Sequence, residues 1–309
     1  MRMVWKGVMP ATTTCFDKSL KVDHAFVAEH GRWLIENGCT GIVTPGSLGE
    51  GATLNSAEKV ELIRTYVRAV GDRAPVVAAV SSLSTEEAVT FAKQAADAGA
   101  SGLMVLPAYV YLGDWRETKA HVQAIFRATS LSCMLYNNPI AYVTDFLPEQ
   151  MAELAGEHRN FEAVKESSGD VRRVTAIRAL LGDRLAILCG VDDVIGEGVA
   201  AGAVGWVAGL ANALPRESVD LFNYAANGDA ERTFALYRWF LPLLRMDVVP
   251  KFVQLIKLVQ QEVGMGHARV RPPRLELAGP ELDQTLKVIR HALANRPAAA
   301  REAAYQNRG

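Results

Sequence analysis

Short runs of apolar, β-branched residues recur along this chain, and segments of helical periodicity separate them. Because parallel strands need a long crossover between them, the alternation predicts a parallel sheet with intervening helices. The apolar runs are continuous, as expected of strands that are buried on both faces. The predicted strands are Gly7–Thr13, Gly41–Pro45, Pro75–Ala79, Gly102–Leu106, Ser132–Tyr136, Phe161–Lys165, Ala186–Cys189 and Gly205–Val207.

The clearest helical pattern covers Ser56–Val70, where apolar residues recur at every third or fourth position. Ser56 is predicted to cap this helix, since a serine side chain can accept a hydrogen bond from a free backbone N–H group. A second helix is predicted over Ser84–Ala98, with Ser84 as its cap and Gly99 at its end.

Eight strand–helix units predict an α/β fold of the closed (β/α)8 TIM-barrel type, with an open doubly wound sheet as the alternative. No GxGxxG motif follows a predicted strand, which argues against a dinucleotide site. From Pro215 to about Leu293 only helical periodicity remains, most clearly in Arg232–Leu244 and Val253–Val263. We therefore expect a barrel over residues 1–214, a C-terminal helical region over 215–295 that packs on it, and a tail over 296–309.

The composition is that of an ordinary globular enzyme. The chain has 309 residues, of which 50% are hydrophobic and 22% are charged, and its formal net charge is -1. A nucleic-acid partner is not expected, because such binders carry a basic excess. The sequence shows no apolar run long enough for a membrane span and no signal-peptide pattern, so a cytoplasmic location is expected.

The four cysteines form no CxxC pair and no cluster with zinc-ligand spacing. We expect them to be reduced and structural, and we expect no metal site. They are Cys15, Cys39, Cys133 and Cys189.

Lys165 is the first candidate for chemistry, because barrel enzymes place their active sites at the C-terminal ends of the strands. It ends the apolar run that begins at Phe161. Partial desolvation there lowers the pKa of the amine and makes it a nucleophile. The alternative is a strand-end lysine whose ammonium group reaches solvent.

Two further strand ends carry polar groups. Tyr136 ends the preceding strand and is predicted to shuttle protons beside Lys165, although a core tyrosine with one hydrogen bond is the alternative. The turn Gly46-Ser47-Leu48-Gly49-Glu50 suits a substrate carboxylate, because its glycines let backbone N–H groups approach an anion. An ordinary strand-to-helix turn is the alternative there.

Asp192 and Asp193 follow the seventh predicted strand. Without a neighbouring histidine or third carboxylate, a hydrogen bond to a substrate hydroxyl or simple loop polarity is favoured over metal binding.

Four motifs together resemble the dihydrodipicolinate synthase/N-acetylneuraminate lyase family. They are GSLGE at 46–50, YNNP at 136–139, VKESSGD at 164–170 and GVDD at 190–193. The resemblance extends to about residue 295. It implies a lysine Schiff-base enzyme with a (β/α)8 barrel and C-terminal helices, no cofactor and a homotetrameric assembly.

The resemblance also implies roles for individual residues. Lys165 matches the Schiff-base lysine, Tyr136 the proton-relay tyrosine, and Ser47 the relay hydroxyl, which is usually threonine. Tyr109 matches a tyrosine that crosses the subunit interface. The expected substrate-binding residues are Gly46, Leu48, Gly49, Asn138, Ser167, Ser168, Gly190, Asp192 and Val207.

The sequence departs from that of dihydrodipicolinate synthase at the second position after YNNP. Dihydrodipicolinate synthase carries an arginine there that clamps a substrate carboxylate, and this chain has Ala141. The stretch YNNPIAY looks closer to the branch that contains 1-pyrroline-4-hydroxy-2-carboxylate deaminase. Runs at 203–217, 235–247 and 271–275 also match that branch, and we expect them to lie mostly outside the reaction centre.

The resulting hypothesis is a deaminase that converts 1-pyrroline-4-hydroxy-2-carboxylate, a cyclic imine, to 2-oxoglutarate semialdehyde and ammonia in hydroxyproline degradation. The alternatives are a 2-keto-3-deoxy sugar acid aldolase or dehydratase, or a 4-hydroxy-tetrahydrodipicolinate synthase, which use the same Lys165–Tyr136 pair. A protein that only binds a 2-oxo acid, without catalysis, is the second alternative.

Overall fold

The computed structural model describes residues 3–297 and contains the predicted barrel. Its parallel strands run in the order β1-β8-β7-β6-β5-β4-β3-β2 in one eight-stranded sheet. The bridge between Ala11 and Val43 joins the two ends and closes the barrel. The strands are β1 (Gly7–Val8), β2 (Ile42–Thr44), β3 (Val76–Val80), β4 (Gly102–Val105), β5 (Ser132–Asn137), β6 (Phe161–Glu166), β7 (Ala186–Cys189) and β8 (Gly205–Trp206).

The first strand is shorter than predicted, and Pro10 explains the difference. Proline has no N–H group and cannot donate to the ladder. The chain nevertheless stays in the barrel wall, because Ala11 N donates to Ala208 O at 2.9 Å and Thr12 N donates to Val43 O at 2.9 Å. Residues 9–12 therefore lie between β8 and β2, which is where the predicted first strand, Gly7–Thr13, would lie.

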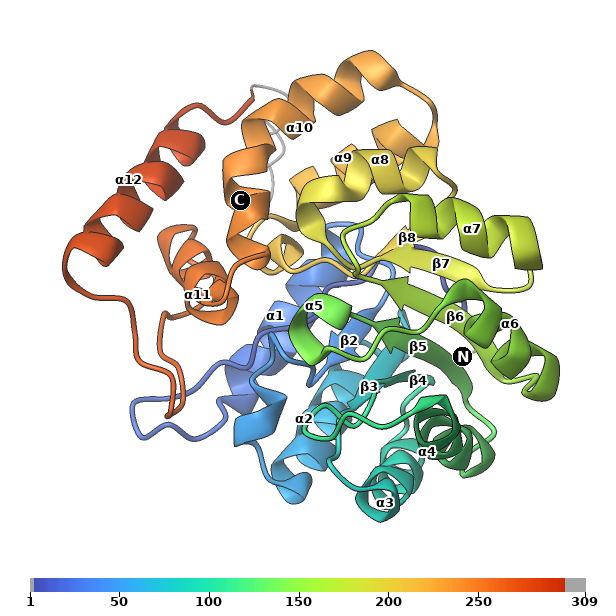
Figure 1. Ribbon diagram of the computed structural model, residues 1–309. Helices are drawn as coiled ribbons and strands as arrows, with labels where there is room; N and C mark the ends of the chain where they lie inside the picture. The colour runs from blue at the N-terminus through green and yellow to red at the C-terminus, as the bar shows by residue number, and fades with distance from the viewer. Residues whose placement is uncertain (1–2, 298–309) are drawn as a thin grey trace.

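Helices surround the sheet, as the alternation predicted (Figure 1). The helix α2 spans Ser56–Val70 as predicted, but its cap is Asn55, whose side chain accepts from Glu58 N. The prediction of Ser56 as the cap was therefore wrong by one residue. Ser84 does cap α3. The barrel helices are α1 (His24–Glu36), α2, α3 (Thr85–Asp97), α4 (Trp115–Arg127), α5 (Pro139–Tyr142), α6 (Pro148–Glu157), α7 (Arg172–Leu181) and α8 (Ile195–Ala200), with short helices η1 (Gly51–Thr53), η2 (Asp192–Val194) and η3 (Leu210–Asn212).

The C-terminal region is helical, and α10 to α12 lie together beside the barrel, drawn in orange and red in Figure 1. The predicted helices at 232–244 and 253–263 correspond to α10 and α11. The division into a barrel over 1–214 and a helical region over 215–295 stays a prediction, and the predicted tail falls almost entirely outside the described residues. The elements are α9 (Pro215–Ala226), α10 (Ala230–Leu244), η4 (Arg245–Asp247), α11 (Phe252–Glu262) and α12 (Gly279–Ala294).

A buried ion pair fastens the C-terminal helices to the barrel. Lys257 Nζ on α11 lies 2.7 Å from Glu50 Oε1 and also donates to Thr14 O at 2.8 Å. The second carboxylate oxygen of Glu50 accepts from Arg271 N at 2.9 Å. Glu50 is fully buried and has a φ of 55°, a left-handed conformation that side chains rarely adopt. These contacts hold the turn at 46–50 against α11.

Within residues 3–297, all four cysteines are buried and free, and no cluster of side chains has a metal-binding arrangement. No helix in this part of the chain is long and apolar enough to cross a membrane.

Candidate active site

A cavity of about 430 Å³ lies at the C-terminal ends of the barrel strands, where three of the predicted catalytic residues, Lys165, Tyr136 and Ser47, meet. Most of the predicted site residues line it. These are Gly46, Ser47, Leu48, Tyr136, Asn138, Lys165, Ser167, Gly190 and Val207. Tyr109, Gly49, Ser168 and Asp192 are not among its lining residues.

Lys165 lies at the end of β6 with its side chain inside the barrel mouth. The residue is only 6% exposed. Burial lowers the pKa of the amine, and electrostatic interactions with neighbouring acidic groups, that with Asp247 first among them, oppose the shift. A Cβ atom at Gly190 would lie 2.5 Å from Lys165 Cε, so glycine at this position leaves room for the lysine stem. Desolvation is the condition that frees a lysine amine for attack on a carbonyl.

Tyr136 is the direct neighbour of Lys165 across the sheet, because β5 and β6 pair these two residues in register. The amino nitrogen of Lys165 lies 4.1 Å from the centre of the Tyr136 ring. The phenol oxygen accepts a hydrogen bond from Asn138 Nδ2 at 3.0 Å. Burial raises the pKa of Tyr136, so the phenol is protonated at neutral pH and can act as a proton donor.

Tyr142 adds a further hydroxyl group to those of Tyr136 and Ser47 at the cavity. The sequence analysis did not assign it a role. Its hydroxyl shares a hydrogen bond with Ser47 Oγ. Its ring centre lies 5.6 Å from that of Tyr136 and 5.6 Å from that of Tyr109. The short helix α5, capped by Asn138, turns Tyr142 toward the cavity. The motif YNNPIAY contained this tyrosine, but only the fold shows that it faces Ser47.

Asp192 has a different position from the one expected of a substrate ligand. Its carboxylate accepts from Trp206 Nε1 at 2.9 Å and from Leu210 N at 2.8 Å. Gly209 N donates to it as well, at 3.1 Å. These bonds occupy the carboxylate inside the protein, so Asp192 holds the turn after β8 rather than pointing into the cavity.

The C-terminal region contributes two charged residues to the cavity, Asp247 and Arg274. Both lie in runs that we expected mostly outside the reaction centre, and for these residues that expectation was wrong. One sequence signal was available. Asp247 lies within the segment 240–249, which is otherwise apolar apart from Arg245, and a charge in such a segment calls for a reason.

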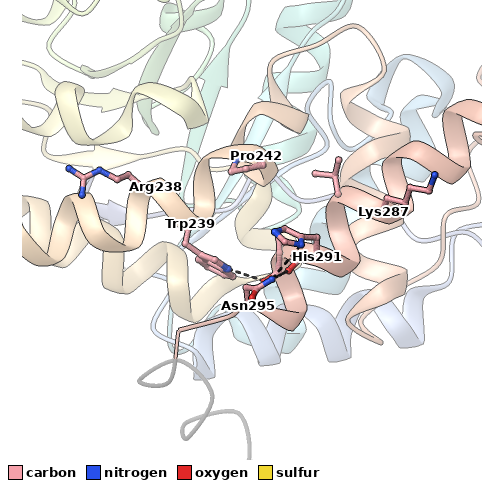
Figure 2. A pocket seen from close by; sticks show the side chains of 8 residues that line it. Arg238, Trp239, Pro242, Lys287, His291 and Asn295 are labelled. Carbon is pink, nitrogen blue, oxygen red and sulfur yellow. Dashed lines mark hydrogen bonds between the residues drawn. The ribbon is translucent and has the colours of Figure 1, made fainter.

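A larger cavity, of about 630 Å³, lies between α10 and α12 and holds none of the predicted catalytic residues (Figure 2). Trp239 Nε1 donates to Ala292 O at 2.9 Å, and Asn295 Nδ2 donates to His291 O at 2.8 Å. Arg238 and Lys287 lie at its rim. Size alone therefore does not identify the reaction centre, whereas the buried lysine and tyrosine of the barrel mouth do.

A buried lysine paired with a tyrosine at the end of a barrel strand defines a class I lyase, an enzyme that works through a lysine Schiff base. The chain belongs to the Dihydrodipicolinate synthetase family, whose model matches residues 4–292. The family resemblance, the barrel fold and the enzyme class expected from the sequence are thereby confirmed.

The curated relatives are named 4-hydroxy-tetrahydrodipicolinate synthases. One from Geobacter metallireducens is 33% identical over 234 residues, covering 76% of this chain and 80% of the relative. Another from Agrobacterium fabrum is 30% identical over 290 residues, covering 94% of this chain and 99% of the relative. These names agree with an alternative from the sequence analysis rather than with its first hypothesis.

Solved structures show the same fold. A dihydrodipicolinate synthase from Bacillus anthracis superposes with a TM-score of 0.89 at 28% identity, covering 93% of this chain and 98% of that one. A dihydrodipicolinate synthase from Acinetobacter baumannii, crystallised with pyruvate, gives a TM-score of 0.89 at 26% identity, covering 94% of this chain and 99% of that one. The chain is thus a family enzyme, and one of its solved relatives binds pyruvate.

Proposed function

We propose that this enzyme deaminates 1-pyrroline-4-hydroxy-2-carboxylate to 2-oxoglutarate semialdehyde and ammonia. The observation that carries the proposal is the cavity wall at Ala141. The family resemblance implies an arginine at this position in dihydrodipicolinate synthase, where it clamps a second carboxylate. A small apolar side chain there suits a substrate with a single carboxylate, since losing a charged bidentate contact costs about 1.5–3 kcal/mol or more.

The reaction begins with attack of the neutral Lys165 amine on C2 of the cyclic imine. The C2–N bond of the ring then breaks, and the departing ring nitrogen takes a proton and becomes a primary amine on C5. Tyr136 is placed to deliver that proton and to receive it back, because its phenol is protonated and lies beside Lys165. The product of this step is an open-chain Schiff base on Lys165.

The substrate carboxylate is assigned to the turn at 46–50. The N–H groups of Glu50 and Gly51 are already bonded to Ser47 O and Gly46 O. Binding therefore falls to the Ser47 hydroxyl and to the backbone N–H groups of Ser47 and Leu48, which line the cavity. Fixed donors at this place hold C2 near Lys165 and stabilise charge during the reaction.

The Schiff base acidifies C3, and loss of a C3 proton gives an enamine. Departure of the C4 hydroxyl as water leaves an unsaturated chain, which rearranges until C5 is an imine. Water then releases ammonia from C5, and a second water releases the product from Lys165. The sum is one substrate and one net water converted to 2-oxoglutarate semialdehyde and ammonia.

A second candidate is 4-hydroxy-tetrahydrodipicolinate synthesis, with 2-keto-3-deoxy sugar acid cleavage as a related one. The names of the relatives favour the synthase. The cavity also contains a cation, Arg274, that offers a bidentate partner to a second carboxylate in place of the missing arginine. The predicted homotetramer, with Tyr109 crossing between subunits, accompanies any of these activities.

The deciding experiment incubates the purified enzyme with each substrate and measures ammonia and pyruvate. Ammonia release from 1-pyrroline-4-hydroxy-2-carboxylate, absent in Lys165→Arg, supports the deaminase. Condensation of pyruvate with aspartate semialdehyde, or pyruvate release from a 2-keto-3-deoxy sugar acid, without ammonia release from the pyrroline, contradicts it.

A further inference from the structure

Among the described residues that line the cavity, Asp247 carries the one carboxyl group, and part of that group has no hydrogen-bond partner, as is also true of Ser167 Oγ. The short helix η4 ends at Asp247 and places it on the cavity wall. Its Oδ1 atom is buried, and among the described residues it has no hydrogen-bond partner. A buried polar atom of this kind costs about 1–3 kcal/mol, so its persistence requires a reason.

The neighbouring backbone makes room for this carboxyl group. A Cβ atom at Gly209 would lie 2.0 Å from Asp247 Oδ1. Glycine is therefore the residue that lets the carboxyl group lie against the turn after β8. The same turn is held by Asp192, whose carboxylate is saturated with donors from Trp206 and Leu210. Asp192 is held by donors of the protein, whereas Asp247 lines the cavity.

The charges around Asp247 favour its protonated form. Burial is the largest influence and raises the pKa of Asp247 well above the ordinary value, and the carboxylate of Asp192 raises it further. Lys165 lowers the pKa of Asp247, and Asp193 raises it. A protonated carboxyl group is a donor, which is what a departing hydroxyl needs.

We infer that Asp247 is a further catalytic residue, whose carboxyl group protonates the hydroxyl that leaves C4 of a substrate held on Lys165. This inference rests on the proposed function and deepens it. Asp247 and Lys165 line the same cavity, where Gly209 lies against the carboxyl group of Asp247 and Gly190 lies against the side chain of Lys165. A substrate bound through C2 to Lys165 extends its outer carbons into the rest of that cavity.

The step balances without any added reagent. In the enamine, the electron pair on nitrogen moves toward C2, the C2=C3 pair forms a C3=C4 double bond, and the C4–O bond breaks. The departing oxygen takes the proton of Asp247 and leaves as water, and Asp247 becomes a carboxylate. The Schiff base, now conjugated, acidifies C5. The Asp247 carboxylate removes a C5 proton, which forms the dienamine and restores the protonated acid for the next turnover.

An acid at Asp247 also affects which bond of the Schiff-base intermediate breaks. Loss of water breaks the C4–O bond, whereas an aldol cleavage breaks the C3–C4 bond. Cleavage of the C3–C4 bond requires a base that removes the proton of the C4 hydroxyl. Loss of that hydroxyl requires an acid that gives it a proton. A buried carboxyl group held in its protonated form therefore favours breaking the C4–O bond over breaking the C3–C4 bond.

The test uses Asp247→Asn, which keeps the size of the side chain and removes its titrating proton. The matched control is Asp193→Asn, which removes a neighbouring negative charge without touching the cavity lining. Three quantities are measured in both variants and in the unmodified enzyme. They are ammonia release from 1-pyrroline-4-hydroxy-2-carboxylate, borohydride trapping of pyruvate on Lys165, and the thermal midpoint of unfolding.

The inference expects Asp247→Asn to lose about 10²–10⁴-fold in ammonia release while trapping pyruvate on Lys165 as the unmodified enzyme does. Asp193→Asn should keep ammonia release within a few-fold. Ammonia release retained in Asp247→Asn overturns the inference and leaves the deaminase intact. Equal loss of trapping and ammonia release also overturns it, because Asp247 would then act on the Lys165 amine.

The two proposals fail in different ways. An unmodified enzyme that releases no ammonia, but cleaves a 2-keto-3-deoxy sugar acid to pyruvate, contradicts the deaminase and with it the role of Asp247 as an acid for a departing hydroxyl. A failure confined to the Asp247→Asn comparison contradicts the inference alone.

If Asp247→Asn does not fold, Asp247→Glu takes its place. Its longer side chain keeps the acid but displaces it, so the inference expects a reduced rate with normal trapping, and an unchanged rate overturns it.

Discussion

The amino nitrogen of Lys165 lies 4.1 Å from the centre of the Tyr136 ring, so the amine meets the face of the ring. An aromatic face favours a cation by about 0.5–2 kcal/mol, which alone would keep the ammonium form. Burial acts in the opposite direction and is the larger influence, since the pKa of Lys165 is lowered overall. The balance gives an amine that is held in place by the ring and is still able to lose its proton.

Removing only the hydroxyl of Tyr136 separates these two functions of the residue. In Tyr136→Phe the ring remains and should still position Lys165, whereas the proton donor is gone. We expect ammonia release to fall by about 10²–10⁴-fold. Borohydride trapping with pyruvate should persist, at a reduced rate. Unchanged turnover in Tyr136→Phe would show that another group carries the proton.

The hydrogen bond between Ser47 and Tyr142 predicts that the proton relay lies within one chain. Tyr142→Phe and Ser47→Ala each remove one partner, so each should lower kcat by about tenfold or more. Because they act on one bond, the double variant should lose little more than either single variant. The measurement is the steady-state rate of all three.

Tyr109→Phe is the matched control for that comparison. Tyr109 packs its ring against Tyr142 and does not line the cavity. Its hydroxyl should matter less than that of Tyr142 if the relay is intramolecular. A larger loss in Tyr109→Phe than in Tyr142→Phe would favour the family arrangement, in which a tyrosine from a neighbouring subunit completes the relay.

Lys257→Met should destabilise the fold strongly, because it leaves the Glu50 carboxylate buried with only Arg274, at 4.0 Å, as a cationic partner. Breaking a buried pair in this way costs about 3–5 kcal/mol. Lys251→Met is the control, since Lys251 forms an exposed pair with Glu281 that is worth about 1 kcal/mol or less. Denaturant unfolding of both variants measures the difference, and equal losses would contradict the importance assigned to the buried pair.

The stability of the fold should fall in mild acid because of His30. Burial lowers the pKa of His30 to about 4, whereas the unfolded chain keeps a value near 6.5. Between these two values the unfolded state binds the extra proton, so the free energy of unfolding decreases as the pH falls from about 6.5 to 4. The full effect of this one group is about 3 kcal/mol.

Acidic side chains titrate in the same pH range as His30. Its contribution is therefore isolated by comparing how steeply the unfolding free energy changes with pH in the variant and in the unmodified protein. His30→Gln removes the titrating ring and retains a donor for Asn212 O, which His30 Nε2 contacts at 2.9 Å. The unfolding free energy of this variant should change less between pH 7 and pH 4 than that of the unmodified protein. Parallel curves would contradict the assignment.

The barrel and the pair Lys165–Tyr136 could be predicted from the sequence because both depend on local pattern. Continuous apolar runs mark the strands, and the residues that end them meet at one face of a barrel whatever the loops do. The pairing of β5 with β6 then follows from their order in the chain. For the same reason most of the turn at 46–50 was correctly expected at the cavity.

Contacts between distant segments could not be predicted in this way. Lys257 contacts Glu50 across more than two hundred residues of chain, and Asp247 lines the cavity from the end of η4, the short helix that follows α10. No periodicity in the sequence encodes where an appended helix packs. The contacts of Asp192 could not be predicted for a related reason, because its partners are the Trp206 indole and backbone N–H groups of the turn at 209–210, which the sequence pattern does not reveal.

The central claim is that the Lys165 amine condenses with a carbonyl, and one measurement tests it most directly. The enzyme is treated with pyruvate and borohydride, digested, and analysed by mass spectrometry, with Lys165→Arg as the parallel sample. The account predicts a reduced pyruvate adduct on the peptide that contains Lys165 and no adduct or turnover in Lys165→Arg. An adduct on another lysine, or full activity in Lys165→Arg, would contradict it.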